Sequence, residues 1–285
     1  MHPDRLFTSF LSDSDMAAIE ETAFLLLETV GISLQHREAV DNLTAMGCRM
    51  EKERVFIPRE AALWGIGHVR PFSAFHRRDG ASAFTLGGSE IRFHNSGGIP
   101  FAVDPDTGQR RNATLKDVRQ ASRLLDCLQH VDMVLPLFAP QDVHPELLAV
   151  ASTDIILRNT QKPVGTAPVD KPAYVPYLVE MAAACCGGMD SLKARPWIVI
   201  PVSPVSPLIF THDVTESMMA VAASGVPLVP LPAPAMGATG PITMAGVLAQ
   251  QHAELLACYL IAATAKEGAW VSYSSRTNPL DMRTA

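Results

Sequence analysis

The pattern of apolar and polar positions changes near residue 90. Before that point short apolar groups recur at helical intervals, which predicts helices over residues 13–30, 36–46 and 59–68 and a strand over residues 54–58. Ser12 and Asp15 have the spacing of a capping box ahead of the first helix. We therefore predict a mixed helical and β cap over residues 1–90, in which residues 72–84 are irregular or β.

From residue 91 onward continuously apolar runs alternate with helical segments. The runs begin near Ile91, Val131, Lys162, Trp197, Val226 and Ala269. The helical segments between them cover residues 115–128, 145–159, 174–186, 213–224 and 243–266. Runs without polar alternation are typical of strands buried on both faces. Such strands joined by helices predict right-handed parallel βα units.

Six such units over residues 91–285 favour an α/β fold of the (β/α)8 TIM-barrel type, incomplete in this chain. An open doubly wound sheet is the alternative, although no GxGxxG motif follows any run. A closed barrel of this type has eight strands. Six strands would leave two parallel edges bare, which is unfavourable in water. We therefore expect the chain to be a fragment of a longer protein.

The carboxyl ends of barrel strands are the usual place for an active site. The residues predicted there are small, uncharged or aromatic, and the candidates for substrate binding are His94, Asn95, Gly97, Gly98, Gln141, Ser203, Ser206, Thr239, Tyr273 and Ser274. A barrel end lined by such residues suits a small ligand that is held by hydrogen bonds and by shape rather than by arginine side chains. Tyr273 is the aromatic residue best placed to face a quaternary ammonium group. The pattern assigns no catalytic residue.

Two of these positions admit a structural interpretation as well. Asn95 either faces a ligand or only satisfies loop backbone, and a lone histidine such as His94 is commonly structural. Gly97 and Gly98 would let the backbone pass close to a ligand, and residues 104–108 predict a hairpin turn. Residues 237–241 are predicted to start the longest helix at Pro241, where free amides could hold an anion.

Composition narrows the function further. The 285 residues carry a net charge of −6 with scattered basic residues, which argues against nucleic acid and anionic membranes as partners. The longest apolar segment, residues 245–265, is interrupted by Gln250, Gln251, His252 and Glu254, so we expect no membrane span. Asp4, Ser9, Ser12 and Asp13 stand where a signal peptide needs an apolar core, and we predict a cytoplasmic protein.

The sequence predicts no metal site. The five cysteines form no CxxC pair and no histidine pair has zinc-ligand spacing, so we expect the thiols to be buried and reduced. A Schiff-base lyase is disfavoured because Lys162 begins a predicted strand and does not end one. A metal-dependent barrel lyase stays as a minor alternative, with His94, Asp142 and Asp281 as its ligands.

Several blocks in order along the chain carry a resemblance to a known family. They are residues 28–32 (ETVGI), 54–58 (RVFIP), 95–114 with its Asp-x-x-Thr-Gly turn, 158–163 (RNTQKP), 203–208 (SPVSPL), 237–241 (GATGP) and 281–284 (DMRT). With these blocks the chain resembles the trimethylamine methyltransferase family, which includes the glycine betaine methyltransferases. The resemblance covers nearly the whole chain.

The resemblance implies a TIM barrel that moves a methyl group from a methylated amine, such as trimethylamine or glycine betaine, to the cobalt of a corrinoid. The cofactor, cob(I)alamin, would be carried by a separate corrinoid protein as partner and not bound directly by this chain. The pyrrolysine position of the family lies beyond residue 285, so the substrate class stays open. A truncated, non-catalytic fragment of such an enzyme is the alternative, and a homo-oligomer is also left open.

Overall fold

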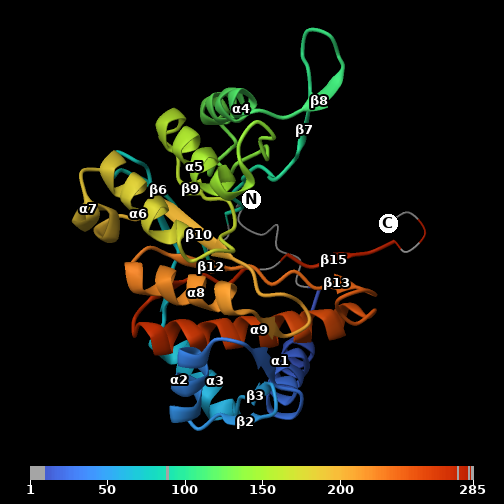
Figure 1. Ribbon diagram of the computed structural model, residues 1–285. Helices are drawn as coiled ribbons and strands as arrows, with labels where there is room; N and C mark the ends of the chain where they lie inside the picture. The colour runs from blue at the N-terminus through green and yellow to red at the C-terminus, as the bar shows by residue number, and fades with distance from the viewer. Residues whose placement is uncertain (1–9, 88–89, 275, 282, 284–285) are drawn as a thin grey trace, which may run out of the picture. The chain divides into compact units, whose positions relative to one another are not determined.

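The computed structural model describes residues 10–87, 90–274, 276–281 and 283. Asp4, Ser9, Met282 and Thr284, which were singled out above or belong to blocks named there, lie outside these residues. The chain divides into two compact units (Figure 1). The central unit comprises residues 73–169 and 173–201, and the terminal unit comprises residues 10–72, 170–172 and 202–285. This division differs from the predicted domain boundary at residue 90, which stays a prediction.

In the central unit four of the predicted apolar runs lie side by side in parallel. Isolated parallel bridges join His94 to Met133, Ile99 to Phe138 and Val134 to Val164, and β9 (Val164–Gly165) pairs in parallel with β10 (Ile198–Val202). The first two runs therefore pair only at single positions. The helices between the runs are α4 (Leu115–Cys127), the 3-10 turn η1 (Pro145–Leu147), α5 (Leu148–Asn159), α6 (Tyr174–Cys185) and α7 (Met189–Ala194).

Two antiparallel hairpins complete the central unit. β5 (Ala74–His76) pairs with β6 (Ser82–Thr85), which confirms a β segment within residues 72–84. β7 (Phe101–Val103) pairs with β8 (Arg110–Asn112) around the predicted turn, and this hairpin projects from the rest of the unit (Figure 1). The turn between β7 and β8 is thus confirmed.

The block at residues 158–163 closes the end of α4. Thr160 Oγ1 and the Gln161 amide both donate to Asp126 Oδ1, at 2.6 and 2.9 Å. Lys162 Nζ donates to the carbonyls of Leu125 and Leu128 at 2.9 and 2.6 Å, where the helix leaves carbonyls unpaired. Burial lowers the pKa of Lys162, while the Asp126 carboxylate acts in the opposite direction. Lys162 is therefore a helix-capping group at the start of a strand.

The terminal unit contains a mixed sheet in the order β11 (Ile209–Phe210), β1 (Ile32–Leu34), β3 (Arg54–Phe56), β2 (Arg49–Glu51). Its helices are α1 (Asp13–Thr29), α2 (Arg37–Ala45), α3 (Arg59–His68), α8 (His212–Ser224) and α9 (Met244–Ala265). The predicted capping box of Ser12 and Asp15 is present at the start of α1. Within the described residues, β13 (Ala235–Met236) also pairs in parallel with β15 (Asn278–Pro279).

A parallel ladder in the terminal unit corrects the expectation of a bare strand edge. β12 (Leu228–Pro230) pairs with β14 (Trp270–Val271), and β14 pairs on its other side with β4 (Arg70–Pro71). The amides of Arg70 and Phe72 donate to the carbonyls of Ala269 and Val271 at 2.8 and 3.0 Å. The polar backbone of the sixth predicted strand is thereby satisfied by a segment of the predicted cap.

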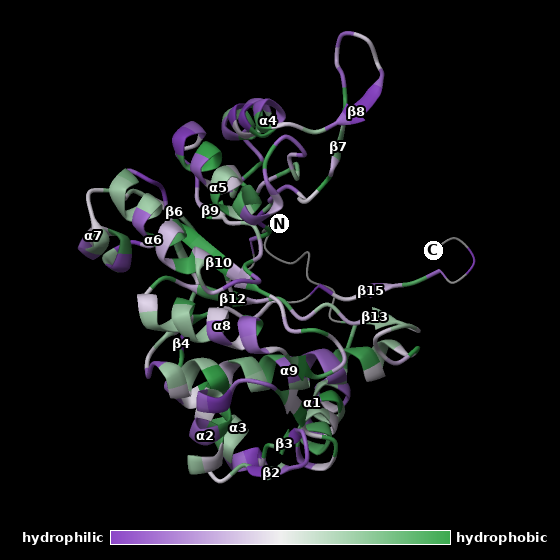
Figure 2. Ribbon diagram, in the orientation of Figure 1, coloured by the Kyte–Doolittle hydropathy of each residue, from purple (hydrophilic) through white to green (hydrophobic). Residues whose placement is uncertain are grey.

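Helix α9 forms the core of the terminal unit. It is apolar on nearly every face and packs against α1, α3 and α8 (Figure 2). It approaches α3 closely at Gly65, where an added Cβ would lie 2.8 Å from the Cα of Leu260. None of the helices among the described residues, α9 included, has the length and apolarity to span a membrane.

Two local predictions are wrong. The longest helix does not start at Pro241 but at Met244, because the hydroxyl of Thr243 accepts from the Gly246 amide at 3.2 Å and caps it. The cysteines are not all buried: Cys127 and Cys185 are exposed, whereas Cys48 and Cys258 are buried. Both exposed thiols stand at the last residue of a helix, where the chain reaches the surface.

The helix contact at Gly65 predicts a difference between two glycines of α3. Gly65→Ala places a methyl group against the backbone of Leu260 and should lower the free energy of unfolding by about 1–3 kcal/mol. Gly67→Ala meets nothing within 4 Å and should raise it by up to about 1 kcal/mol. Urea denaturation measures both changes. Equal effects of the two substitutions would show that the helices do not approach at Gly65.

Candidate functional site

Asn95 joins the first and second apolar runs of the central unit. Its Nδ2 donates to the carbonyls of Leu135 and Ser96 at 2.9 and 2.7 Å, and its Oδ1 accepts from the Leu135 amide at 2.9 Å. The side-chain amide thus takes the place of a backbone peptide in a strand pair. These contacts correspond to the structural interpretation of Asn95, and a direct role in ligand binding stays a prediction.

The other candidates of the central unit lie next to Asn95 or on the following loop. His94 is exposed, with its Nδ1 2.9 Å from the carbonyl of Asn95. A Cβ at Gly97 would lie 2.5 Å from the carbonyl oxygen of Pro136, and Gly98 has a φ of +80°. The close backbone approach predicted for this glycine pair is therefore made to the neighbouring run. Gln141 is exposed and donates from Nε2 to the carbonyl of Ala139 at 2.9 Å.

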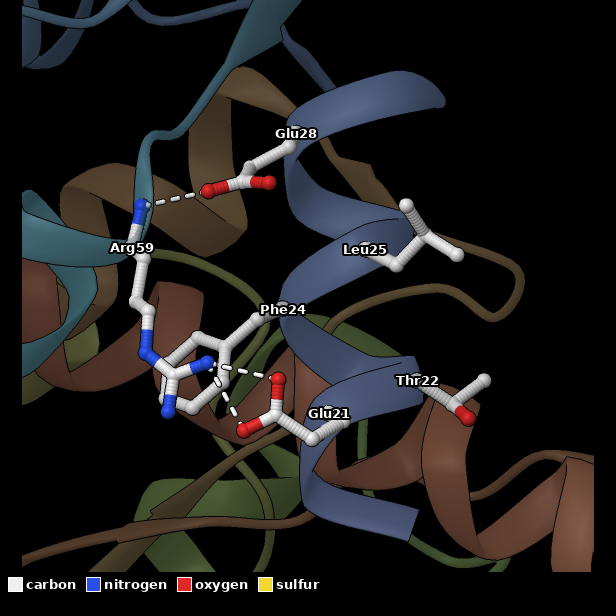
Figure 3. A pocket seen from close by; sticks show the side chains of 6 residues that line it. All are labelled: Glu21, Thr22, Phe24, Leu25, Glu28 and Arg59. Atoms are coloured by element: carbon white, nitrogen blue, oxygen red, sulfur yellow. Dashed lines mark hydrogen bonds and ion pairs between the residues drawn. The ribbon is translucent and has the colours of Figure 1, made fainter. Parts of the chain in front are cut away.

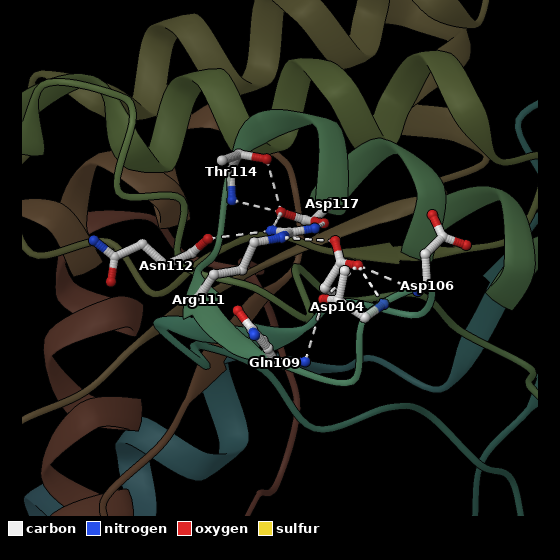
Figure 4. A network of polar contacts seen from close by, with 8 residues as sticks. Asp104, Asp106, Gln109, Arg111, Asn112, Thr114 and Asp117 are labelled. Atoms are coloured by element: carbon white, nitrogen blue, oxygen red, sulfur yellow. Dashed lines mark hydrogen bonds and ion pairs between the residues drawn. The ribbon is translucent and has the colours of Figure 1, made fainter.

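An ion-pair network fixes the β7–β8 hairpin to the start of α4 (Figure 4). Asp104 Oδ1 accepts from the Thr107 amide at 3.0 Å and so shapes the turn. Arg111 Nε donates to Asp104 at 3.2 Å. The two terminal nitrogens of its guanidinium group form a bidentate pair with the Asp117 carboxylate, at 2.8 and 2.9 Å. Asp117 also forms the capping box of α4 with Thr114. The Arg111 hydrogen bonds hold the pKa of Asp117 well below its ordinary value, against the effect of burial.

In the terminal unit, α9 supplies the polar partners of the candidate loops. Ser206 Oγ donates to Glu254 Oε2 at 2.8 Å, and the Leu208 amide donates to Glu254 Oε1 at 3.0 Å. Gln250 Nε2 donates both to Glu254 Oε1 at 3.0 Å and to the carbonyl of Thr239 at 2.9 Å. One buried carboxyl group and one amide thus link the loop that carries Ser206 to the loop that carries Thr239.

The loop after β14 is attached to the same stretch of α9. The hydroxyl of Tyr273 lies 3.2 Å from His252 Nδ1, and the hydroxyl of Thr277 donates to Gln251 Oε1. Ser274 donates to the carbonyl of Pro230 at the end of β12. Burial lowers the pKa of His252, while Tyr273 is 60% exposed. An exposed aromatic face with its hydroxyl held in place is suited to contact a ligand.

Glu254 is fully buried and receives only uncharged donors from the residues it bonds. Burial raises its pKa, and the hydrogen bonds from Leu208, Ser206 and Gln250 oppose that rise. A carboxyl group in this setting is costly unless its lone pairs are satisfied. Ser206, which donates to this carboxyl group, is half-buried.

Sequence reasoning missed Gln250, His252 and Glu254 as site residues. A signal was present, because polar residues interrupt an otherwise apolar helix at these positions. Polar side chains in a buried helix require hydrogen-bond partners, which neighbouring loops can supply. The predicted anion site at residues 237–241 is also wrong: the amides of Gly237, Ala238 and Gly240 bond to carbonyls within the loop. Ser203 is half-buried just after β10.

A shallow pocket of about 290 Å³ opens beside α1 and contains none of the predicted site residues (Figure 3). Arg59 lies over the ring of Phe24 at 4.4 Å and donates to both oxygens of Glu21 at 2.8 and 2.7 Å. The carboxylate of Glu28 accepts from the Arg59 amide at 3.0 Å and caps α3. These charged groups are paired with one another, and their contacts hold α1 against α3.

Among the described residues no three His, Cys, Asp or Glu side chains are grouped as a metal ion would require. Two of the ligands considered for a metal-dependent lyase have backbone partners instead: Asp142 accepts from the Leu115 amide at 2.9 Å, and His94 contacts Asn95. The minor alternative of a metal-dependent lyase gains no support from this arrangement.

Comparison with known proteins identifies the family. The family model described as trimethylamine methyltransferase (MTTB) matches residues 4–285. The chain belongs to the trimethylamine methyltransferase family. It is 31% identical over 274 residues to trimethylamine methyltransferase MttB of Desulfitobacterium hafniense (strain DSM 10664 / DCB-2), which covers 95% of this chain and 55% of that protein.

Other members of the family are more distant. Glycine betaine methyltransferase of Desulfitobacterium hafniense (strain Y51) is 27% identical over 277 residues, covering 96% of this chain and 57% of that protein. Trimethylamine methyltransferase MttB of Methanosarcina barkeri (strain Fusaro / DSM 804) is 24% identical over 302 residues, covering 98% of this chain and 57% of that protein. The chain therefore spans little more than half the length of these curated relatives.

The contacts of Asn95 predict a loss of stability on its removal. Asn95→Ala leaves the amide and carbonyl of Leu135 without side-chain partners, and the free energy of unfolding should fall by about 2 kcal/mol. Gln141→Ala, which removes one exposed hydrogen bond, should change it by less than about 0.5 kcal/mol. Chemical denaturation followed by circular dichroism distinguishes the two. An unchanged free energy of unfolding in Asn95→Ala would contradict the bracing role of its side chain.

The network around Arg111 predicts a pH-dependent contribution from Asp117. Its folded pKa is depressed, so its stabilisation is complete above the ordinary aspartate pKa of about 3.9 and is lost as pH falls toward the folded value. Asp117→Asn should therefore cost about 2 kcal/mol at pH 7 and less at pH 3.

The matched control for Asp117 is Asp106→Asn in the β7–β8 turn, since Asp106 gives the network only its backbone amide. Urea denaturation at pH 7 and pH 3 measures both variants. A deficit of Asp117→Asn that does not depend on pH would contradict the ionised network.

Proposed function

We propose that the protein carrying this chain transfers a methyl group from a methylated amine to the cobalt of a corrinoid held by a separate protein. The observation that carries the proposal is the family match over residues 4–285. The names of two relatives, a trimethylamine methyltransferase and a glycine betaine methyltransferase, support a methylated ammonium compound as substrate.

The chemistry asks for positioning more than for proton transfer. The methyl carbon bonds to cobalt with an electron pair that the corrinoid supplies, while the carbon–nitrogen pair stays on the nitrogen, which leaves as a neutral amine. A quaternary amine needs no proton for this step. The protein has to align the N-methyl group and exclude water. The uncharged candidates Ser206 and Thr239 and the exposed ring of Tyr273 fit such a role.

We also propose that the parallel runs are strands of a (β/α)8 barrel that further residues of the protein complete. The bridges from His94 to Met133 and from Val134 to Val164, followed by the β9–β10 pair, give the first four runs the neighbour order of such a barrel. In the terminal unit β12 and β14 have the parallel pairing expected of its fifth and sixth strands. Within each unit the candidate residues would then lie at the carboxyl ends of its strands.

A second candidate function is a truncated chain that binds a ligand or partner without catalysis. It is favoured by one observation, that the chain spans 55–57% of the relatives named above. Such a chain would retain the loops attached to α9 but lack residues that the longer relatives contain.

The test compares the longest gene product that contains this chain with the 285-residue chain itself. Each is incubated with cob(I)alamin and either trimethylamine or glycine betaine, and methylcobalamin is followed by its absorbance. We expect transfer by the longer protein. Transfer by the longer protein alone would support the truncated-chain function for these 285 residues. Absence of transfer by the longer protein from a broad panel of methylated amines would overturn the proposal.

A further inference from the structure

The buried carboxyl group of Glu254 determines how the hydroxyl of Ser206 is oriented. Two of its partners, the Leu208 amide and Gln250 Nε2, are only able to donate, and both donate to Oε1. Of the three partners, only Ser206 carries a hydroxyl group, which is able either to donate or to accept a hydrogen bond. When it is ionised, the carboxyl group only accepts, and the Ser206 proton then points inward to Oε2. The oxygen lone pairs of Ser206 then face away from Glu254.

The loop that holds Ser206 is fixed by contacts on both sides. Leu208 has a φ of +57°, a conformation that residues other than glycine rarely adopt. Its amide donates to Glu254, and its carbonyl accepts from the Ser33 amide of β1 at 2.9 Å. Strained backbone of this kind persists only where neighbouring contacts enforce it, and it is common at functional sites. Ser206 is therefore presented in a defined position.

The charge behind Ser206 has a consequence for the ligand. The three groups that bond Glu254 are uncharged, and the carboxyl group is fully buried, where solvent screens its field weakly. The side of Ser206 that faces away from an ionised Glu254 thus combines an acceptor oxygen with a negative charge one hydrogen bond behind it. That combination attracts a cation and gives a neutral group of equal shape no advantage.

We propose that Glu254 is a positioning residue that makes the site selective for a cationic ammonium group, by turning the acceptor side of Ser206 toward it. This inference rests on the proposed function and specifies how that site recognises its substrate. Gln250 extends the arrangement to the Thr239 loop, because the same amide group bonds both Glu254 and the Thr239 carbonyl.

The substitution Glu254→Gln separates this role from a structural one. Glutamine keeps an oxygen to accept from Leu208 and Gln250, but its amide donates to Ser206 and turns the serine proton outward. The ligand pair is glycine betaine and 3,3-dimethylbutyrate, which have the same shape and carboxylate while only the first has a quaternary ammonium. Binding is measured by calorimetry on the longest gene product that contains this chain.

We expect the wild-type protein to bind glycine betaine more tightly than 3,3-dimethylbutyrate. Glu254→Gln should weaken betaine binding roughly tenfold and change binding of 3,3-dimethylbutyrate, whose tert-butyl group is uncharged, less than about twofold. Ser206→Ala should lose the same preference. Glu216→Gln, which removes a carboxylate bonded to His36 elsewhere in the terminal unit, should preserve it. Thermal unfolding by circular dichroism checks that each variant is folded.

Equal weakening of both ligands in Glu254→Gln would show a purely structural role and overturn the inference. A preference that persists in Ser206→Ala would overturn it as well, since the effect would then not act through Ser206. If the wild-type protein shows no ammonium preference but still transfers methyl groups from trimethylamine, the inference fails and the proposed function stands. Absence of both binding and transfer overturns the proposed function together with the inference.

Discussion

A carboxyl group inside an apolar helix has to be given hydrogen bonds, and in α9 only the neighbouring loops supply them. Glu254 is fully buried, so the loop at Ser206 and Leu208 must lie against the helix for the terminal unit to fold. Gln250 imposes the same requirement on the loop at Thr239. The need to satisfy these polar groups therefore fixes the positions of the loops on which we predict substrate binding.

Several blocks that carry the family resemblance serve the fold directly. Arg54 donates to the carbonyls of Val30 and Gly31 at 2.6 Å each, and so connects the blocks at residues 28–32 and 54–58. Residue 31 also has to be a glycine, because a Cβ at Gly31 would lie 2.6 Å from the carbonyl oxygen of Val55. Lys162 in a later block closes the end of α4. Resemblance over such blocks therefore identifies the fold and the contacts that stabilise it more directly than it identifies the reaction.

The two units hold their candidate residues by different means. In the central unit Asn95 imitates a backbone peptide, so its polar groups are used to join two runs. In the terminal unit the polar groups that join the loops come from α9, which leaves the ring of Tyr273 exposed and Ser206 partly accessible. The terminal-unit residues are thus better placed to contact a ligand, and the proposed methyl transfer, whose leaving group is an uncharged amine, requires such contacts rather than acids and bases.

The sequence by itself determined most of the helices, the apolar runs that pair in parallel within each unit and the family resemblance, because each depends on local periodicity or on ordered blocks of residues. It also located the candidate loops, since these follow the apolar runs directly. Only the tertiary structure decided that β4 covers the edge of β14 and that Asn95 bonds Leu135. The same holds for Glu254, which bonds a residue 48 positions earlier in the chain. Contacts between distant segments depend on how buried polar groups find partners, and no local pattern specifies that choice.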